Sequence, residues 1–221
     1  MAGLYTSNRR FEFRKSGLVC GVQFDRSLRE PAFMALRSTM NSYFPISDPT
    51  WTSLREFCDF RQLEKHRFLY PAGVHPKSFS FVYSGLFRLF YADQDGSEYN
   101  KNFFDSGSFP GSMAALLKGE VSEYAIESLE DSSVITINFR RFRQLLLQAD
   151  DLKMFQIYYL EKNWLLEKDA RELQIVQEDA AQRYQRFLGR YPSIAARIPQ
   201  YHIASHLGIT PTQLSRVRKK G

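Results

Sequence analysis

The chain has 221 residues, of which 43% are hydrophobic and 15% aromatic, so two modules could each bury a core. No apolar run approaches the ~18 residues of a membrane span and the N-terminus has no apolar signal segment, so we expect a cytoplasmic protein without membrane contact. Its two cysteines, Cys20 and Cys58, have no Cys or His at metal-ligand spacing, which argues against a zinc site or a disulfide framework.

The net charge of +6 is unevenly distributed along the chain. Residues 181–221 contain eight Arg or Lys and no Asp or Glu, a charge of +8. The rest of the chain has 22 basic and 24 acidic residues, a charge of −2. This asymmetry suggests nucleic acid as the partner of the C-terminal segment.

Residues 1–30 are basic and show no clear periodicity, so we expect a flexible basic arm. Such an arm could make a second DNA contact, or it could be an extension that contributes little.

Residues 31–150 change from helical to strand periodicity. Apolar residues three and four apart predict a helix over 33–44, and a second short helix follows over 51–57 after Pro45 and Pro49. Six aromatic or β-branched segments separated by turn residues come next: 68–70, 79–83, 86–91, 99–104, 124–129 and 134–139. Short strands at this spacing predict an antiparallel β-roll, and the fold class is therefore α+β.

A helix is predicted over 152–177, which contain neither Gly nor Pro. Its apolar residues, spaced alternately by three and four, predict a homodimer seam within a dimerisation helix of 151–178: Leu152, Phe155, Tyr159, Leu166, Leu173 and Val176. A second stripe (Met154, Tyr158 and Leu165) could pack on the roll. The alternative is a single amphipathic helix that lies against its own domain.

Residues 179–221 have the pattern of a helix-turn-helix. Gly208 ends the first helix, because glycine adopts the left-handed conformation without steric cost. Thr210 then caps the second helix, and Pro211 begins it. The apolar residues Ile203, Ala204, Leu207, Leu214 and Val217 would pack the two helices together. The alternative is a helical hairpin packed on a larger domain with a solvated charged face.

The outer face of the second helix carries side chains suited to DNA. Arg216 can donate two hydrogen bonds to guanine, and Gln213 can pair with adenine. Lys219 and Lys220 suit phosphates. The predicted DNA-binding residues are Thr210, Thr212, Gln213, Ser215, Arg216, Arg218, Lys219 and Lys220.

Two histidines on the first helix, His202 and His206, are four apart and could share a metal ion, but no third ligand is evident, and residues 201–206 would instead face phosphates. The sequence also has no Walker-type or dinucleotide-type glycine loop and lacks the histidine pair of cupin-type metalloenzymes. We therefore expect neither a metal site nor an enzyme, since no catalytic candidates are present.

Residues 203–211 (IASHLGITP) and 213–220 (QLSRVRKK) resemble the C-terminal signature of the Crp–Fnr family of transcription factors. The stretches 70–73 (YPAG), 81–89 (FVYSGLFRL), 95–98 (DGSE) and 107–111 (GSFPG) resemble the sensor domain of that family in order and spacing. The resemblance implies a dimer with a cyclic-nucleotide-binding-type roll, a long dimer helix and a DNA-reading helix-turn-helix.

The chain departs from this family at the phosphate cassette. Members that bind cyclic nucleotides have a Gly-Glu pair, and an Arg-Ser/Thr-Ala stretch about ten residues later. Here Gly111 precedes Ser112, and Glu123-Tyr124 replaces the arginine stretch. Because a carboxylate near a partly buried phosphate is repulsive, we expect no cyclic AMP binding.

The sequence thus predicts a homodimeric transcription regulator on a pseudo-palindromic operator, in contact with RNA polymerase and independent of cyclic AMP. The effector, if there is one, is unknown. A first alternative is a regulator of the same family that responds to a cyclic nucleotide or another small ligand. A second is a ligand-binding or metal-binding roll with a non-functional basic tail.

Overall fold

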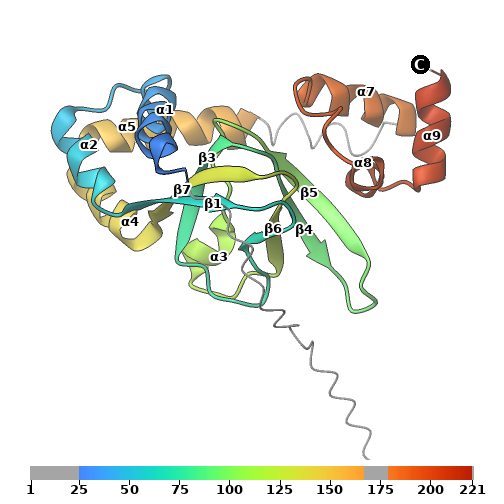
Figure 1. Ribbon diagram of the computed structural model, residues 1–221, viewed down its shortest axis with the longest axis horizontal. Helices are drawn as coiled ribbons and strands as arrows, with labels where there is room; N and C mark the ends of the chain where they lie inside the picture. The colour runs from blue at the N-terminus through green and yellow to red at the C-terminus, as the bar shows by residue number, and fades with distance from the viewer. Residues whose placement is uncertain (1–24, 167–178, 221) are drawn as a thin grey trace, which may run out of the picture.

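The structure, a computed structural model, describes residues 25–166 and 179–220. Helices α1 (Arg29–Asn41), α2 (Asp48–Arg55), α4 (Phe139–Gln148) and α5 (Asp150–Leu160) lie at one end of the molecule (Figure 1). Two β-sheets form the middle, with the short helix α3 (Met113–Lys118) beside them. Helices α7 (Ala180–Arg190), α8 (Gln200–Leu207) and α9 (Pro211–Lys220) form a head (residues 179–220) at the other end.

The last six residues of the basic arm expected over 1–30 are folded. A 3₁₀ turn, η1 (Arg26–Leu28), leads directly into α1, and the Asp25 carboxylate accepts a hydrogen bond from the Ser27 N–H at 2.9 Å. Residues 25–30 are therefore part of the folded domain, and residues 1–24 lie outside the described part of the chain.

The roll (residues 58–138) consists of two antiparallel sheets. The three-stranded sheet has the order β1 (Cys58–Leu63), β7 (Ser132–Asn138), β3 (Ser78–Ser84), and the four-stranded sheet has the order β2 (Phe68–Tyr70), β6 (Tyr124–Ser128), β4 (Phe87–Ala92), β5 (Glu98–Phe104). The β-roll expectation is confirmed, and each predicted strand coincides with an observed one to within a residue or two.

Strand β1 was not predicted. It begins at Cys58, one residue after the apolar pattern assigned to the preceding helix, and polar residues occupy half of its six positions. Antiparallel pairing with β7 along its whole length forms it instead. Cys58 is buried there, and burial raises the pKa of its thiol to about 12, so it is a packing residue.

The three-stranded sheet is buried on both faces, because strand residues alternate between two cores. Val82 and Val134 face the other sheet and pack with Phe87 and Ile126. Phe81, Ile135 and the other odd-numbered apolar residues of β3 and β7 instead face the helical core formed by α1, α2, α4 and α5.

The predicted dimer seam does not fit the observed position of α5. Leu152 and Phe155 are buried in the helical core, with 0% and 3% exposure, so these side chains have no surface left for a partner. Tyr159 is half-buried, with its ring 5.5 Å from that of Tyr43. Leu166 is exposed, whereas Leu173 and Val176 lie outside the described residues.

A different stripe of this helix is exposed. After α5 the helix continues through a π-helical turn, η2 (Glu161–Leu165). Ile157, Leu160 and Trp164, three and four residues apart, are exposed by 45%, 39% and 51%. This stripe is neither of the two that the sequence predicted, and in the stripe expected to pack on the roll Tyr158 and Leu165 are exposed by 42% and 57%.

Candidate DNA interface and ligand pocket

The turn between α8 and α9 has the predicted geometry. Gly208 has φ 67°, the left-handed conformation, and the Ile209 N–H donates to the Ala204 carbonyl at 3.0 Å. Ile203, Leu207 and Leu214 are buried between the helices, which confirms the predicted inward face.

Helix α7 completes the core of the head and was not predicted. Asp179 and Gln182 form a reciprocal capping box at its start, and Phe187 is buried against α8. An Asp followed three residues later by Gln is a known helix-start signal, so this pattern could have revealed α7.

A second capping box occupies two of the predicted DNA-binding side chains. The Gln213 N–H donates to Thr210 Oγ1 at 3.2 Å, and the Thr210 N–H donates to Gln213 Oε1 at 2.8 Å. Gln213 would have to break this bond to pair with an adenine, so its first role here is to cap α9.

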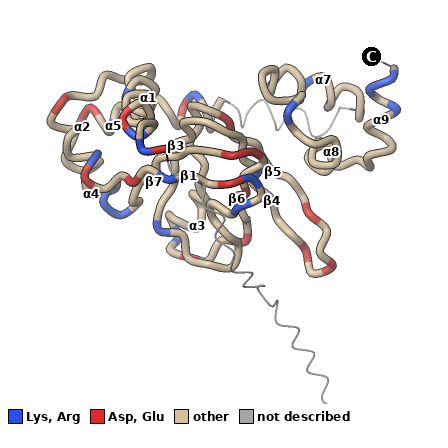
Figure 2. Tube along the Cα trace, viewed as in Figure 1, with Lys and Arg blue, Asp and Glu red and all other residues tan. Residues whose placement is uncertain are grey.

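The other predicted DNA-binding residues follow along α9, and Figure 2 shows basic residues and no acidic residues on this helix. Those with exposed side chains are Thr212, Ser215, Arg216, Arg218 and Lys219. The side chain of Lys220 is not among those described. By helix spacing, Thr212, Ser215, Arg216 and Lys219 share one exposed face, and Arg218 lies on its flank.

The outer side of α8 is not free for phosphates, contrary to the expectation for residues 201–206. Tyr201 is exposed, but His202 is 4% exposed and lies beside Arg88 and Asn100. Ser205 and His206 also hydrogen-bond to β5. Among the described residues, no group of three potential metal ligands is found.

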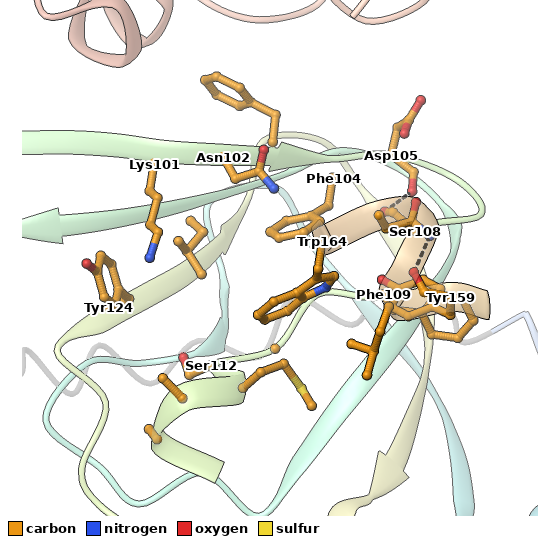
Figure 3. A pocket seen from close by; sticks show the side chains of 18 of the residues that line it. Lys101, Asn102, Phe104, Asp105, Ser108, Phe109, Ser112, Tyr124, Tyr159 and Trp164 are labelled. Atoms are coloured by element: carbon orange, nitrogen blue, oxygen red, sulfur yellow. Dashed lines mark hydrogen bonds between the residues drawn. The ribbon is translucent and has the colours of Figure 1, made fainter. Parts of the chain in front are cut away.

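A cavity of about 1250 Å³ lies between the four-stranded sheet, α3, the α5–η2 helix and the start of the α7–α8 connection. Eight aromatic side chains contribute to its walls, and Figure 3 shows Trp164 directed into its centre. The aromatic side chains in the lining are Tyr43, Phe103, Phe104, Phe109, Tyr124, Tyr159, Trp164 and Tyr191.

The residues of the phosphate cassette lie in this cavity wall. Ser112 and Ser122 are buried, and their hydroxyls hydrogen-bond to each other at 2.7 Å. Glu123 also lines the cavity, as do Gly111 and Tyr124. A phosphate at this end would meet a carboxylate and hydroxyls that already have a partner.

Two cationic side chains line the cavity from segments that the sequence did not connect to it. Arg190 comes from α7 and Lys101 from β5. Lys101 is the extra residue of a β-bulge, since Leu89 pairs with Asn102 and Phe90 with Asn100. Its ammonium lies 4.5 Å from the centre of the Tyr124 ring (Figure 3). The cavity therefore offers aromatic walls with cations at its edge.

Comparison with known proteins gives consistent matches. Residues 60–149 match the model of the cyclic nucleotide-binding domain. A curated relative, the cAMP-activated global transcriptional regulator CRP of Pasteurella multocida (strain Pm70), is 23% identical over 110 residues. These residues are 50% of this chain and 53% of the relative, so the match spans about half the length of each.

Solved structures share the fold over most of the chain. The c-di-GMP-responsive global regulator CLP of Xanthomonas campestris has a TM-score of 0.61 at 17% identity and covers 79% of this chain and 91% of its own. FixK2 of Bradyrhizobium japonicum has a TM-score of 0.62 at 17% identity, with 74% and 83% covered.

A mutant of CooA from Carboxydothermus hydrogenoformans has a TM-score of 0.62 at 17% identity, with 84% of this chain and 83% of its own covered. In the described residues, no helix is long and apolar enough to cross a membrane. By these comparisons, residues 60–149 are similar to cyclic nucleotide-binding domains, and the chain shares the fold of the solved regulators named above.

Proposed function

We propose that the protein is a sequence-specific, homodimeric DNA-binding transcription regulator. The observation that carries this proposal is the exposed side of α9, from which Arg216 and Lys219 point to solvent while Leu214 holds the helix on the head. The similarity to transcription regulators supports it.

The exposed stripe of Ile157, Leu160 and Trp164 supports the homodimer. Leu160 and Trp164 also line the cavity, and a second copy that covered this stripe would remove from water the part of the three apolar side chains that remains exposed. Their spacing is that of a two-helix seam. A dimer also allows the short α9 to recognise a longer DNA sequence, because two copies about 34 to 36 Å apart read two half-sites one DNA turn apart.

The proposal includes independence from cyclic AMP. The support is the chemistry of the cavity, in which Glu123 stands near the cassette and Ser112 and Ser122 bond to each other. The aromatic walls fit an apolar or aromatic effector better than a cyclic phosphate. An anionic effector is the alternative, since Lys101 and Arg190 both line the cavity.

Selection of bound fragments from random DNA tests the regulator function, and we expect an inverted repeat with half-sites about one helical turn apart. On the selected operator, Arg216→Ala should cost about 1 to 3 kcal/mol of binding free energy and relax the preference at one base position. Lys219→Ala is the matched control and should weaken all duplexes alike. A basic tail without function would select no sequence at all.

Titration calorimetry with cyclic AMP tests the effector. We expect no saturable heat, and no change in operator affinity when the nucleotide is added. Saturable binding that Lys101→Met or Arg190→Met abolishes would instead identify a nucleotide-responsive regulator with an altered phosphate site.

A further inference from the structure

The buried guanidinium of Arg88 joins three strands to the head. Arg88 lies on β4, and its side chain is 6% exposed. It donates from Nε (2.8 Å) and Nη2 (2.5 Å) to Glu127 on β6, and from Nη1 to Glu98 on β5 at 2.5 Å. Its Nη1 also lies 3.2 Å from Nδ1 of His202 on α8.

His202 takes part as an acceptor. Its Nδ1 faces two donors, Arg88 Nη1 and the Asn100 side-chain amide at 3.2 Å, so this nitrogen carries no proton. Burial and the charge of Arg88 lower the pKa of His202 to about 4, and Glu98 opposes this shift. The imidazole is therefore neutral in this arrangement at neutral pH.

The free edge of β5 is covered by the same helix. Ser205 Oγ accepts from the Asn100 N–H at 3.0 Å and donates to the Glu98 carbonyl at 2.6 Å. His206 Nδ1 lies 3.1 Å from the Asn100 carbonyl, to which it must donate because a carbonyl only accepts. Since β5 is the last strand of its sheet, α8 supplies the hydrogen bonds that a further strand would make.

Apolar packing holds the same surfaces together but does not orient them as strictly. Leu86, Phe103 and Leu129 of the roll are buried in one cluster with the apolar residues of the head. Apolar contact is non-directional, whereas hydrogen bonds to a rigid guanidinium and to a strand edge have one geometry. The polar contacts therefore determine the angle at which the head sits.

We propose that this latch, made by Arg88, Asn100, His202 and Ser205, sets the orientation of the head on the roll and thereby the half-site spacing that the dimer accepts. The inference rests on the proposed function, because spacing has meaning only for a dimer that reads two half-sites. A head that rocks on its apolar contact displaces α9 relative to its symmetry mate. His202 and Ser205 are thus positioning residues for operator choice and do not touch DNA themselves.

The test is a series of operators in which the selected half-sites are moved apart or together by single base pairs. His202→Leu removes the acceptor, and His202→Asn restores an acceptor oxygen near the position of Nδ1. We expect wild type and His202→Asn to prefer one spacing. His202→Leu should bind that spacing about tenfold more weakly and lose about tenfold of its preference over neighbouring spacings, because a loosened head must be ordered on binding.

Ser205→Ala provides a second variant that acts through the β5 edge and leaves the Arg88 cluster intact. Ser205→Ala should also lose preference for the wild-type half-site spacing over neighbouring spacings. Far-ultraviolet circular dichroism and urea unfolding check that each variant is folded. If folded His202→Leu and Ser205→Ala keep the wild-type spacing profile, the latch does not set it. If wild type binds no duplex, the proposed function itself fails.

Acid provides an independent readout. The groups that face His202 are Arg88, Glu98, Glu127 and His66 from the roll, and Tyr201 on α8 itself. Because the docked pKa of His202 is depressed from 6.5 to about 4, docking is favoured above pH 6.5 and weakens as pH falls from 6.5 towards 4. Wild type should therefore lose spacing preference as pH falls from about 6.5 towards 4, and His202→Asn should keep it. Equal loss in both proteins would overturn the role of His202.

Discussion

Phe103→Ala is expected to lower the free energy of unfolding by about 3 to 5 kcal/mol, the range for removing a buried phenylalanine. Phe103 belongs to β5 but is 3% exposed within the core of the head. Its ring centre lies 6.1 Å from that of Phe187, 5.8 Å from Tyr191 and 5.4 Å from His206. The substitution would leave a cavity between roll and head that their rigid backbones cannot close.

Differential scanning calorimetry gives a second result for the same variant. Wild type should unfold in one transition, because roll and head share a core, and Phe103→Ala should separate the head as an earlier transition. Tyr99→Ala is the control on the same strand, since Tyr99 is 54% exposed and should change stability by less than about 1 kcal/mol. An equal loss in both variants would show that Phe103 does not join the two units.

Gly85→Ala is the second substitution with a large expected effect, more than about 3 kcal/mol. Gly85 has φ +108°, and a Cβ placed there would lie 2.0 Å from Ser132 Oγ and 2.8 Å from Ser132 Cα. The second clash is with backbone, so a rotamer change of Ser132 cannot relieve it. The β3–β4 turn would have to move, and with it Leu86 and the start of β4, which carries Phe87 and Arg88.

Gly73→Ala separates the clash from the backbone strain. Gly73 has φ +77°, and a Cβ there would meet nothing within 4 Å, so only the left-handed conformation is penalised, by about 1 to 2 kcal/mol. Urea unfolding of both variants measures the difference. Similar losses would mean that the close approach to Ser132 is not what requires glycine at position 85.

Local signals predicted the parts of the fold that local interactions form. The β-strands carry aromatic and β-branched residues between turn residues, and both signals act within a few residues of the chain. The α8–α9 turn is similar, because Gly208 and Thr210 need only their neighbours to adopt their conformations. Strand β1 was missed because it pairs with β7, which is far away in the chain; Asp59 and Thr136, for example, are 77 residues apart.

The stripes of α5 show the limit of a periodic pattern. The sequence placed Leu152 in a seam between two chains, but Ile157 is also apolar and lies on another side of the same helix. Which row packs on α1 and α4 depends on the shape of a surface built by distant segments. The structure buries Leu152 and exposes Ile157.

The residues of the candidate sites likewise include some that local sequence could place and others that only the tertiary structure places. Arg216 could be assigned to an exposed face from its spacing to Leu214, since both lie on one helix of known period. Lys101 could not be assigned to the cavity, because a bulge in the pairing of β4 with β5 redirects its side chain. Arg190 reaches the same wall only through the docking of the head.

The sequence by itself determined the basic C-terminal segment, the helix-turn-helix with its glycine, and the succession of strands, because charge, turn chemistry and periodicity are written in neighbouring residues. Only the tertiary structure decided that His202 accepts from Arg88 and that Ser205 covers the edge of β5. These partners are more than 100 residues apart, and packing of the whole chain, not local preference, brings them together.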